Sequence, residues 1–212
     1  MRIVLVHGAA TTSRIWARVV AELPEFEVLT PERPSTGHLE SEVAFLAPLC
    51  EGAVVGGVSG GATLGLALAA AGVPFHAAVL HEPAAGSLVP GLLDAVVAAY
   101  RAGGVTGFAA TLYGPLWSAA DGPADDAAVA RDLAMFRGYE PAAPADGAGP
   151  VLLTVGGDSP PVRHQVATAL TTALGVPSRT IPGVGHAVHL EAPGVFAALL
   201  LAAATATPGR PG

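Results

Sequence analysis

The sequence predicts an α/β domain built on a mostly parallel sheet of about six strands that is flanked by helices. Short apolar, β-branched runs alternate with segments rich in alanine and leucine, which is typical of such a fold. Most of these runs are apolar throughout, as expected of strands that helices cover on both faces. With 212 residues, 51% hydrophobic and 13% charged, the chain suits one domain, residues 1–212, with a large core.

The expected elements follow one another in order along the chain. The expected strands are Arg2–Val6, Phe26–Leu29, Ala53–Val58, Ala77–His81, Val151–Val155 and Ser178–Ile181. The expected helices are Ser13–Glu22, Glu40–Leu49, Gly60–Ala71, Val162–Leu174 and Pro193–Ala204. Residues 84–149 break the alternation: apolar residues recur there at helical spacing, which predicts a small helical cap inserted into the domain. We expect residues 205–212 to be frayed.

Composition and charge exclude several classes of function. The chain contains no lysine, which excludes Schiff-base chemistry and a Walker-type phosphate loop. The ten arginines are scattered and the formal net charge is −7, so the sequence lacks the cluster of positive charge that nucleic-acid binding needs. The single cysteine, Cys50, excludes an internal disulfide and favours a cytoplasmic location. We expect no metal and no cofactor, and a small molecule as the partner; a homodimer is compatible with the sequence.

The mean hydropathy, +0.54, is high enough to raise the question of a membrane span. The best candidate by sequence, Ala53–Ala71, is interrupted by five glycines. A span needs about 20 predominantly apolar residues in a helix. We therefore expect no membrane span.

The strongest motif is Gly57-Val58-Ser59-Gly60-Gly61, which matches G-x-S-x-G. The motif lies between an apolar strand and an apolar helix, where a serine on a sharp, strained turn is exposed as a nucleophile. Neighbouring glycines let the chain make this turn without a side-chain clash. The alternative is a glycine-rich turn that binds phosphate or only packs. The context favours Ser59 as a nucleophile.

A serine hydroxyl needs a base, and on this strand–turn–helix arrangement the base follows an acid in the chain. His186 comes directly after the last expected strand, which favours it as the base. His189 is the rival and is interpreted as structural. For the acid we predict Asp158, which follows the strand Val151–Val155. Glu82, at the end of the strand after that of the serine, is the alternative, and Asp158 would then only cap a helix.

Backbone groups complete the expected site. An acyl-transfer site needs N–H donors for the developing oxyanion. The N–H of Gly60 adjoins the serine, and the turn after the first strand offers the N–H of Ala9. His7, at the buried end of that strand, is interpreted as a hydrogen-bonded structural residue.

Taken together, these motifs resemble the α/β-hydrolase superfamily over nearly the whole chain. Val4–Gly8 is similar to its oxyanion motif, Gly57–Gly61 to its nucleophile elbow, and Gly185-His186 to its histidine loop. Glu82-Pro83 also resembles the residues that follow the next strand in this superfamily, which makes Glu82 a fold residue rather than a catalyst. The resemblance implies an α/β-hydrolase fold with an eight-stranded sheet trimmed to about six strands and a cap at residues 84–149. It implies no substrate, because this fold hosts many chemistries.

The chain departs from the family pattern at two places. Ser35 stands where a glycine is usual after Arg33-Pro34. The acid motif usually has the form Gly-x-x-Asp, whereas Gly156-Gly157-Asp158 is one residue shorter. The second departure leaves open which carboxylate serves the histidine.

The favoured function is hydrolysis of an ester, lactone or thioester through an acyl-serine intermediate. Apolar cap residues predict a mainly apolar substrate, and the candidate pocket residues are Leu92, Val96, Phe108, Tyr113, Trp117 and Phe136. One alternative is a non-hydrolytic cyclase or lyase that uses His186 as a general base. Another is a binding protein in which the site is vestigial. A serine nucleophile argues against epoxide hydrolases and dehalogenases of this fold, which use an aspartate.

Overall fold

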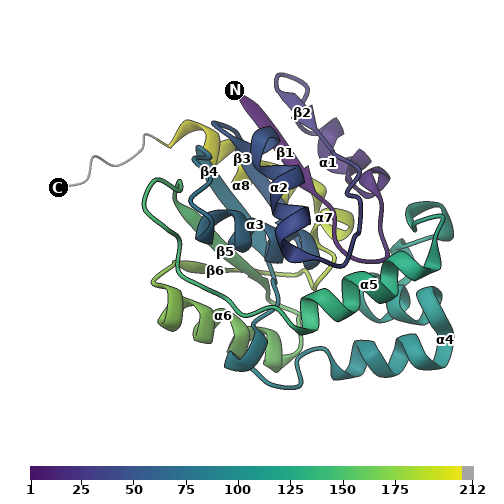
Figure 1. Cartoon of the computed structure of the whole chain (residues 1–212). Coiled ribbons are helices and arrows are strands. Elements are labelled where there is room, and N and C mark those ends of the chain that lie inside the picture. Colours follow the sequence, from purple (N-terminus) through teal and green to yellow (C-terminus); the bar gives the residue numbers. More distant parts are fainter. Residues whose placement is uncertain (207–212) are drawn as a thin grey trace.

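The computed structural model describes residues 1–206, in which six strands form one sheet (Figure 1). The strands are β1 (Arg2–Val6), β2 (Glu27–Leu29), β3 (Val54–Val58), β4 (Ala77–His81), β5 (Val151–Gly156) and β6 (Ser178–Ile181). Their order is β2-β1-β3-β4-β5-β6, and each neighbouring pair is parallel. Every expected strand is present with bounds that differ by at most one residue. The α/β-hydrolase fold that the motifs implied is confirmed.

Helices cover both faces of the sheet. They are α1 (Ala17–Ala21), α2 (Leu39–Cys50), α3 (Gly60–Ala70), α6 (Pro161–Leu174), α7 (Val188–Glu191) and α8 (Pro193–Thr205), with a 3₁₀ turn η1 (Ser13–Trp16) before α1. Helices α1 and α8 pack together on one face, α2 and α3 on the other, and α6 against β5 and β6 (Figure 1). Every residue of β3 is buried, as are nearly all of α3, which explains why both segments are apolar throughout. The predicted fraying of residues 205–212 falls largely outside the described residues.

The segment between β4 and β5 is helical, as expected. Its elements are η2 (Gly86–Leu88), α4 (Asp94–Tyr113), η3 (Gly114–Leu116), η4 (Ala119–Asp121) and α5 (Asp126–Arg137). Helices α4 and α5 contact each other at one end of the molecule (Figure 1). Helix α4 starts only at Asp94, because Pro90 lacks an N–H and Gly91 has a positive φ of 82°. We call residues 84–149 the cap.

One helix in the described part of the chain, Asp94–Leu116, is long and apolar enough to cross a membrane by length and composition. The backbone leaves the helical region inside it, at Gly103 and Gly104. Val96 and Phe108 of this helix are buried against the core. The expectation of no membrane span stays a prediction.

A buried arginine ties the cap to the core. The Arg33 guanidinium bonds the Asp132 carboxylate on α5 at 2.7 Å and the Glu42 carboxylate on α2 at 3.0 Å. Its Nε also donates to the His7 carbonyl at 2.9 Å. Burial raises the pKa of Asp132, although the nearby guanidinium opposes this. Because two carboxylates meet one cation in the interior, losing that cation would leave both without compensation.

Candidate active site

Ser59 lies at the carboxyl end of β3, on the turn into α3. Its backbone is strained, with φ 57° and ψ −121°, and its N–H donates to the His81 carbonyl at 2.9 Å. A Cβ on Gly61 would lie 1.8 Å from the Val6 carbonyl oxygen, and one on Gly57 would lie 2.6 Å from the Gly61 backbone. No side chain fits at either position. The glycines of the motif therefore permit the sharp turn that presents Ser59.

His186, in the loop after β6, is bound to a buried carboxylate. Its Nδ1 lies 2.7 Å from Oε2 of Glu82, which follows β4 directly and has a positive φ of 50°. A carboxylate can only accept, so Nδ1 carries the proton and Nε2 is free to accept another. Nε2 is buried and has no hydrogen-bond partner among residues 1–206. The imidazole thus has the tautomer that a general base needs.

The structure contradicts the predicted pairing of His186 with Asp158. Asp158 is exposed, and no hydrogen bond from its carboxylate to the described residues is present. Three residues after Gly156, where the family motif places its acid, the chain has Ser159. The buried Ser159 hydroxyl donates to Oε1 of Glu82. The carboxylate bonded to His186 is therefore that of Glu82, the alternative, which follows β4, and not that of Asp158, which follows β5.

Three donors hold the Glu82 carboxylate: His186, the Ser159 hydroxyl and the Gly156 N–H at 2.9 Å. Burial alone would raise the pKa of Glu82, but the His186 hydrogen bond and the charges of its neighbours hold it well below its usual range. One of these neighbours is Arg163 of α6, whose Nε lies 3.5 Å from Oε2. Burial and the Arg163 guanidinium lower the pKa of His186, against the opposing effect of Glu82. At neutral pH the site therefore holds an ionised Glu82 and a neutral His186.

A second histidine positions the loop that carries His186. Nε2 of His81 lies 3.1 Å from the Gly185 carbonyl, and its Nδ1 lies 3.0 Å from the Thr154 hydroxyl. A carbonyl only accepts, so Nε2 donates and Nδ1 accepts from Thr154. Burial lowers the pKa of His81 to about 4, which keeps this arrangement neutral. His81 thereby fixes the peptide that precedes His186.

The two histidines interpreted as structural, His7 and His189, are both buried, and their structural role stays a prediction. His7 accepts the Arg33 N–H at Nε2 and donates to the Gly8 carbonyl from Nδ1, at 3.2 and 3.1 Å. His189 is buried beside the Trp16 ring, with ring centroids 5.1 Å apart. Neither histidine forms a hydrogen bond with the Glu82 carboxylate in the part of the chain that the structure describes.

The two predicted oxyanion donors lie beside the serine. The Gly8 carbonyl accepts from Thr11 and Arg33, so in the trans peptide the Ala9 N–H points the opposite way. The Gly60 N–H is the first of α3 and has no acceptor within the helix. A Cβ on Gly8 would lie 3.3 Å from the Gly60 nitrogen, so the two turns are in contact. Ala9, Ser59 and Gly60 line one cavity.

This cavity, which we call the serine cavity, measures only about 20 Å³. That is room for about one water molecule. Its walls come from the sheet ends, the cap and α6: Ala9, Ser59, Gly60, Thr63, Glu82, Ala84, Leu93, Val96, Phe108, Leu112, Leu133, Phe136 and Arg163. In this structure the serine cavity has no room for a larger molecule.

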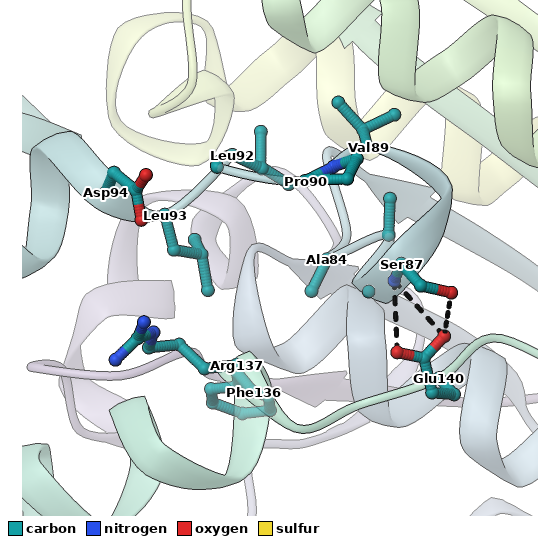
Figure 2. A pocket seen from close by; sticks show the side chains of 13 residues that line it. Ala84, Ser87, Val89, Pro90, Leu92, Leu93, Asp94, Phe136, Arg137 and Glu140 are labelled. Carbon is teal, nitrogen blue, oxygen red and sulfur yellow. Dashed lines mark hydrogen bonds between the residues drawn. The ribbon is translucent and has the colours of Figure 1, made fainter.

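A larger cavity of about 350 Å³, shown in Figure 2, adjoins the serine cavity and shares Ala84, Leu93 and Phe136 with it. In Figure 2, Leu93 lies opposite Phe136, and the Ser87–Glu140 hydrogen bonds lie at one end. Phe136 also covers the elbow, because a Cβ on Gly60 would lie 2.4 Å from its ring. We call this the outer cavity; Leu93 and Phe136 separate it from Ser59.

The six predicted pocket residues divide among different places. Val96, Phe108 and Phe136 line the serine cavity, and Leu92 lines the outer cavity. Tyr113 and Trp117 instead donate hydrogen bonds to the turn after β1. Three residues of the site were not predicted from the sequence: His81, Ser159 and Arg163. Of these three, only Ser159 could have been found from the sequence, because it stands where the motif Gly-x-x-Asp, counted from Gly156, has its aspartate.

Comparisons with known proteins agree with this fold. The model of the Alpha/beta hydrolase family matches residues 3–199, so the chain belongs to the alpha/beta hydrolase family. A comparison with curated protein sequences gave no significant match.

Solved structures with the same fold include a lipase-esterase related protein from Clostridium acetobutylicum, with 13% identity, TM-score 0.74, and 95% of this chain and 93% of that chain covered. An esterase from Thermogutta terrifontis has 19% identity and TM-score 0.69, with 95% and 88% covered. The enol-lactonase from Burkholderia xenovorans has 21% identity and TM-score 0.70, with 97% and 91% covered. At these identities the likeness shows the fold.

Proposed function

We propose that the protein is a serine hydrolase that cleaves an ester, lactone or thioester through an acyl-serine intermediate. The observation that supports this most is the hydrogen bond between His186 Nδ1 and Glu82 at 2.7 Å, which leaves a buried, unpartnered Nε2 within the described chain. Ser59, on its strained turn, is the nucleophile that such a base serves. The esterases and the lactonase among the structural neighbours are consistent with this reaction class.

The first half of the reaction acylates the serine. Ser59 Oγ forms a bond to the substrate carbonyl carbon while its proton passes to Nε2 of His186. The carbonyl π electrons move onto the oxygen, which the N–H groups of Ala9 and Gly60 stabilise. Glu82 stabilises the imidazolium through Nδ1. Collapse of the intermediate expels the alcohol or thiol, which takes the proton from Nε2.

The second half returns the serine. A water molecule gives its proton to His186 Nε2 and attacks the acyl carbon, and the second tetrahedral intermediate collapses to release the acid. Ser59 recovers its proton from the imidazolium. His186 is competent in both halves because its lowered pKa keeps it neutral before each attack.

The substrate is mainly apolar. Apart from Glu82, Arg163 and Thr63, the side chains around Ser59 in the serine cavity are apolar. The outer cavity, which shares Leu93 and Phe136 with it, offers space for an acyl or alcohol group.

The test uses purified protein and a panel of p-nitrophenyl esters, lactones and thioesters. We expect turnover by the wild type and a loss of roughly 10⁴-fold or more in kcat on Ser59→Ala, with an unchanged circular dichroism spectrum. A matched control, Ser41→Ala, changes an exposed serine of α2 that lines neither cavity, and it is expected to retain activity. Turnover by Ser59→Ala equal to that of the wild type would reject the nucleophile.

A further inference from the structure

The hydroxyl of Tyr113 lies where the two halves of the site meet. Tyr113 is the last residue of α4 and is buried. Its hydroxyl donates to the Ala9 carbonyl at 2.8 Å, and the Ser59 side chain lies near enough to it to act on the pKa of the phenol. Its ring lies 6.0 Å, centroid to centroid, from that of His186. Tyr113, a residue of the cap, therefore lies beside Ser59, beside the turn after β1 that carries Ala9 (the oxyanion turn), and near the His186 ring.

The phenol oxygen faces the same small space as a predicted oxyanion donor. A Cβ built on Gly8 would lie 3.1 Å from the Tyr113 oxygen and 3.3 Å from the Gly60 nitrogen. The Tyr113 oxygen and the Gly60 nitrogen therefore lie on the same side of Gly8, close to each other. The Ala9 residue, whose N–H is the other donor, accepts the phenol hydrogen at its carbonyl.

Tyr113 keeps its proton under the conditions of the reaction. Burial raises the pKa of Tyr113 above its ordinary value, although the nearby Ser59 side chain opposes this. A neutral, buried phenol can donate a strong hydrogen bond but does not act as a base.

We propose that the Tyr113 hydroxyl is a third donor to the oxyanion, beside the N–H groups of Ala9 and Gly60. The inference rests on the proposed hydrolase function. In the resting site the phenol hydrogen bonds the Ala9 carbonyl, and His186 Nε2 has no partner among residues 1–206. When the substrate carbonyl oxygen enters, the phenol hydrogen turns to it and Ser59 turns to Nε2. No covalent bond forms or breaks at the phenol, and its proton stays in place.

Trp117 provides a matched control. Its Nε1 donates to the Ala10 carbonyl at 3.0 Å, so it also links the cap to the oxyanion turn. Neither Trp117 nor Tyr113 is a wall of the serine cavity; what sets Tyr113 apart is that its oxygen lies beside Ser59 and Gly8. Tyr113→Phe and Trp117→Phe each remove one hydrogen bond from the cap to a backbone carbonyl of this turn, at a similar cost in stability of about 1–3 kcal/mol.

The experiment measures kcat and KM for p-nitrophenyl butyrate and the inhibition constant of a trifluoromethyl ketone, which forms a tetrahedral adduct with a serine. For Tyr113→Phe we expect kcat to fall about 100-fold with KM within about threefold, as for loss of one oxyanion donor. The inhibition constant should rise by a similar factor. For Trp117→Phe we expect kcat within about threefold of the wild type. Urea unfolding of both variants checks that they are folded.

Two results would overturn the inference. Equal losses of kcat in the two variants would mean that Tyr113 only positions the turn. Wild-type kcat in Tyr113→Phe would mean that its hydroxyl does not act in the reaction. Failure of the proposed function would look different, because the wild-type protein itself would then show neither ester turnover nor inhibition by the ketone.

Discussion

Replacing Glu82 by glutamine tests which carboxylate serves the histidine. In the wild type, Oε1 accepts from the Gly156 N–H and the Ser159 hydroxyl, and Oε2 accepts from His186. Those two donors would hold the amide oxygen of the introduced glutamine on their side, so its NH₂ would face Nδ1 of the imidazole. Two donors cannot share a hydrogen bond, so Nδ1 must lose its proton and Nε2 must carry it. A protonated Nε2 cannot accept the proton of Ser59.

The expected loss is therefore large. The wrong tautomer in a serine–histidine–carboxylate site lowers kcat by about 10⁴-fold, which corresponds to about 5 kcal/mol in the activation free energy. For Glu82→Gln we expect a fall in kcat for p-nitrophenyl butyrate of about 10³–10⁴-fold, with KM little changed. Thermal unfolding of the variant confirms that the fold is intact.

Asp158→Asn is the matched control, because it makes the same change of charge at the carboxylate that the sequence favoured. Asp158 is exposed and its backbone N–H donates to the Val184 carbonyl, a bond that the substitution leaves in place. We expect kcat within about twofold of the wild type, as for a surface change. Normal activity in Glu82→Gln together with a large loss in Asp158→Asn would refute the assignment of Glu82.

Three further predictions concern stability and specificity. Burial lowers the pKa of His7 and His189 to about 3, so below pH 6.5 the unfolded chain takes up protons that the folded chain does not. Stability should therefore fall as the pH drops from about 6.5 toward 3, and a melting temperature that stays constant from about pH 7 to 5 would contradict this. Arg33→Met leaves two buried carboxylates unpaired and should cost about 3–5 kcal/mol in urea unfolding. Arg131→Met, which breaks an exposed ion pair, should cost less than about 1 kcal/mol; equal costs would refute the role of Arg33. Phe136→Ala joins the serine cavity to the outer cavity and should shift the ratio of kcat/KM toward longer acyl chains by about tenfold in a C2–C10 ester series. An unchanged chain-length profile would mean that Phe136 does not limit the site.

The sequence predicts the sheet well because a parallel sheet buried on both faces needs uninterrupted apolar strands. Every residue of β3 and of β4 is buried, and both runs are apparent from composition. Parallel strands place their carboxyl ends at one edge, so Ser59 and the His186 loop could be expected to meet there. The glycines after Ser59 also allow the turn to be predicted, since the structure leaves no room for a side chain at Gly61.

The acid could not be fixed from the sequence because it depends on side-chain direction. Asp158 and Ser159 are neighbours on one turn, yet Ser159 is buried and Asp158 is exposed. Which of them points inward depends on where the turn starts, and this differs by one residue from the family pattern. The strand order places β4 beside β5, so Glu82 meets Gly156 and Ser159, and the loop after β6 brings His186 to the same carboxylate. The cap contacts of Tyr113 span 104 residues and leave no local pattern in the chain.

Intact-mass spectrometry after reaction with a fluorophosphonate tests the central claim most directly, because the probe forms a stable bond only with an activated serine. We predict a single adduct on the wild-type protein, located on Ser59 by peptide mapping, no adduct on Ser59→Ala, and slow labelling of Glu82→Gln. An adduct on a different residue, or ester turnover by a wild-type protein that the probe leaves unmodified, would contradict the account.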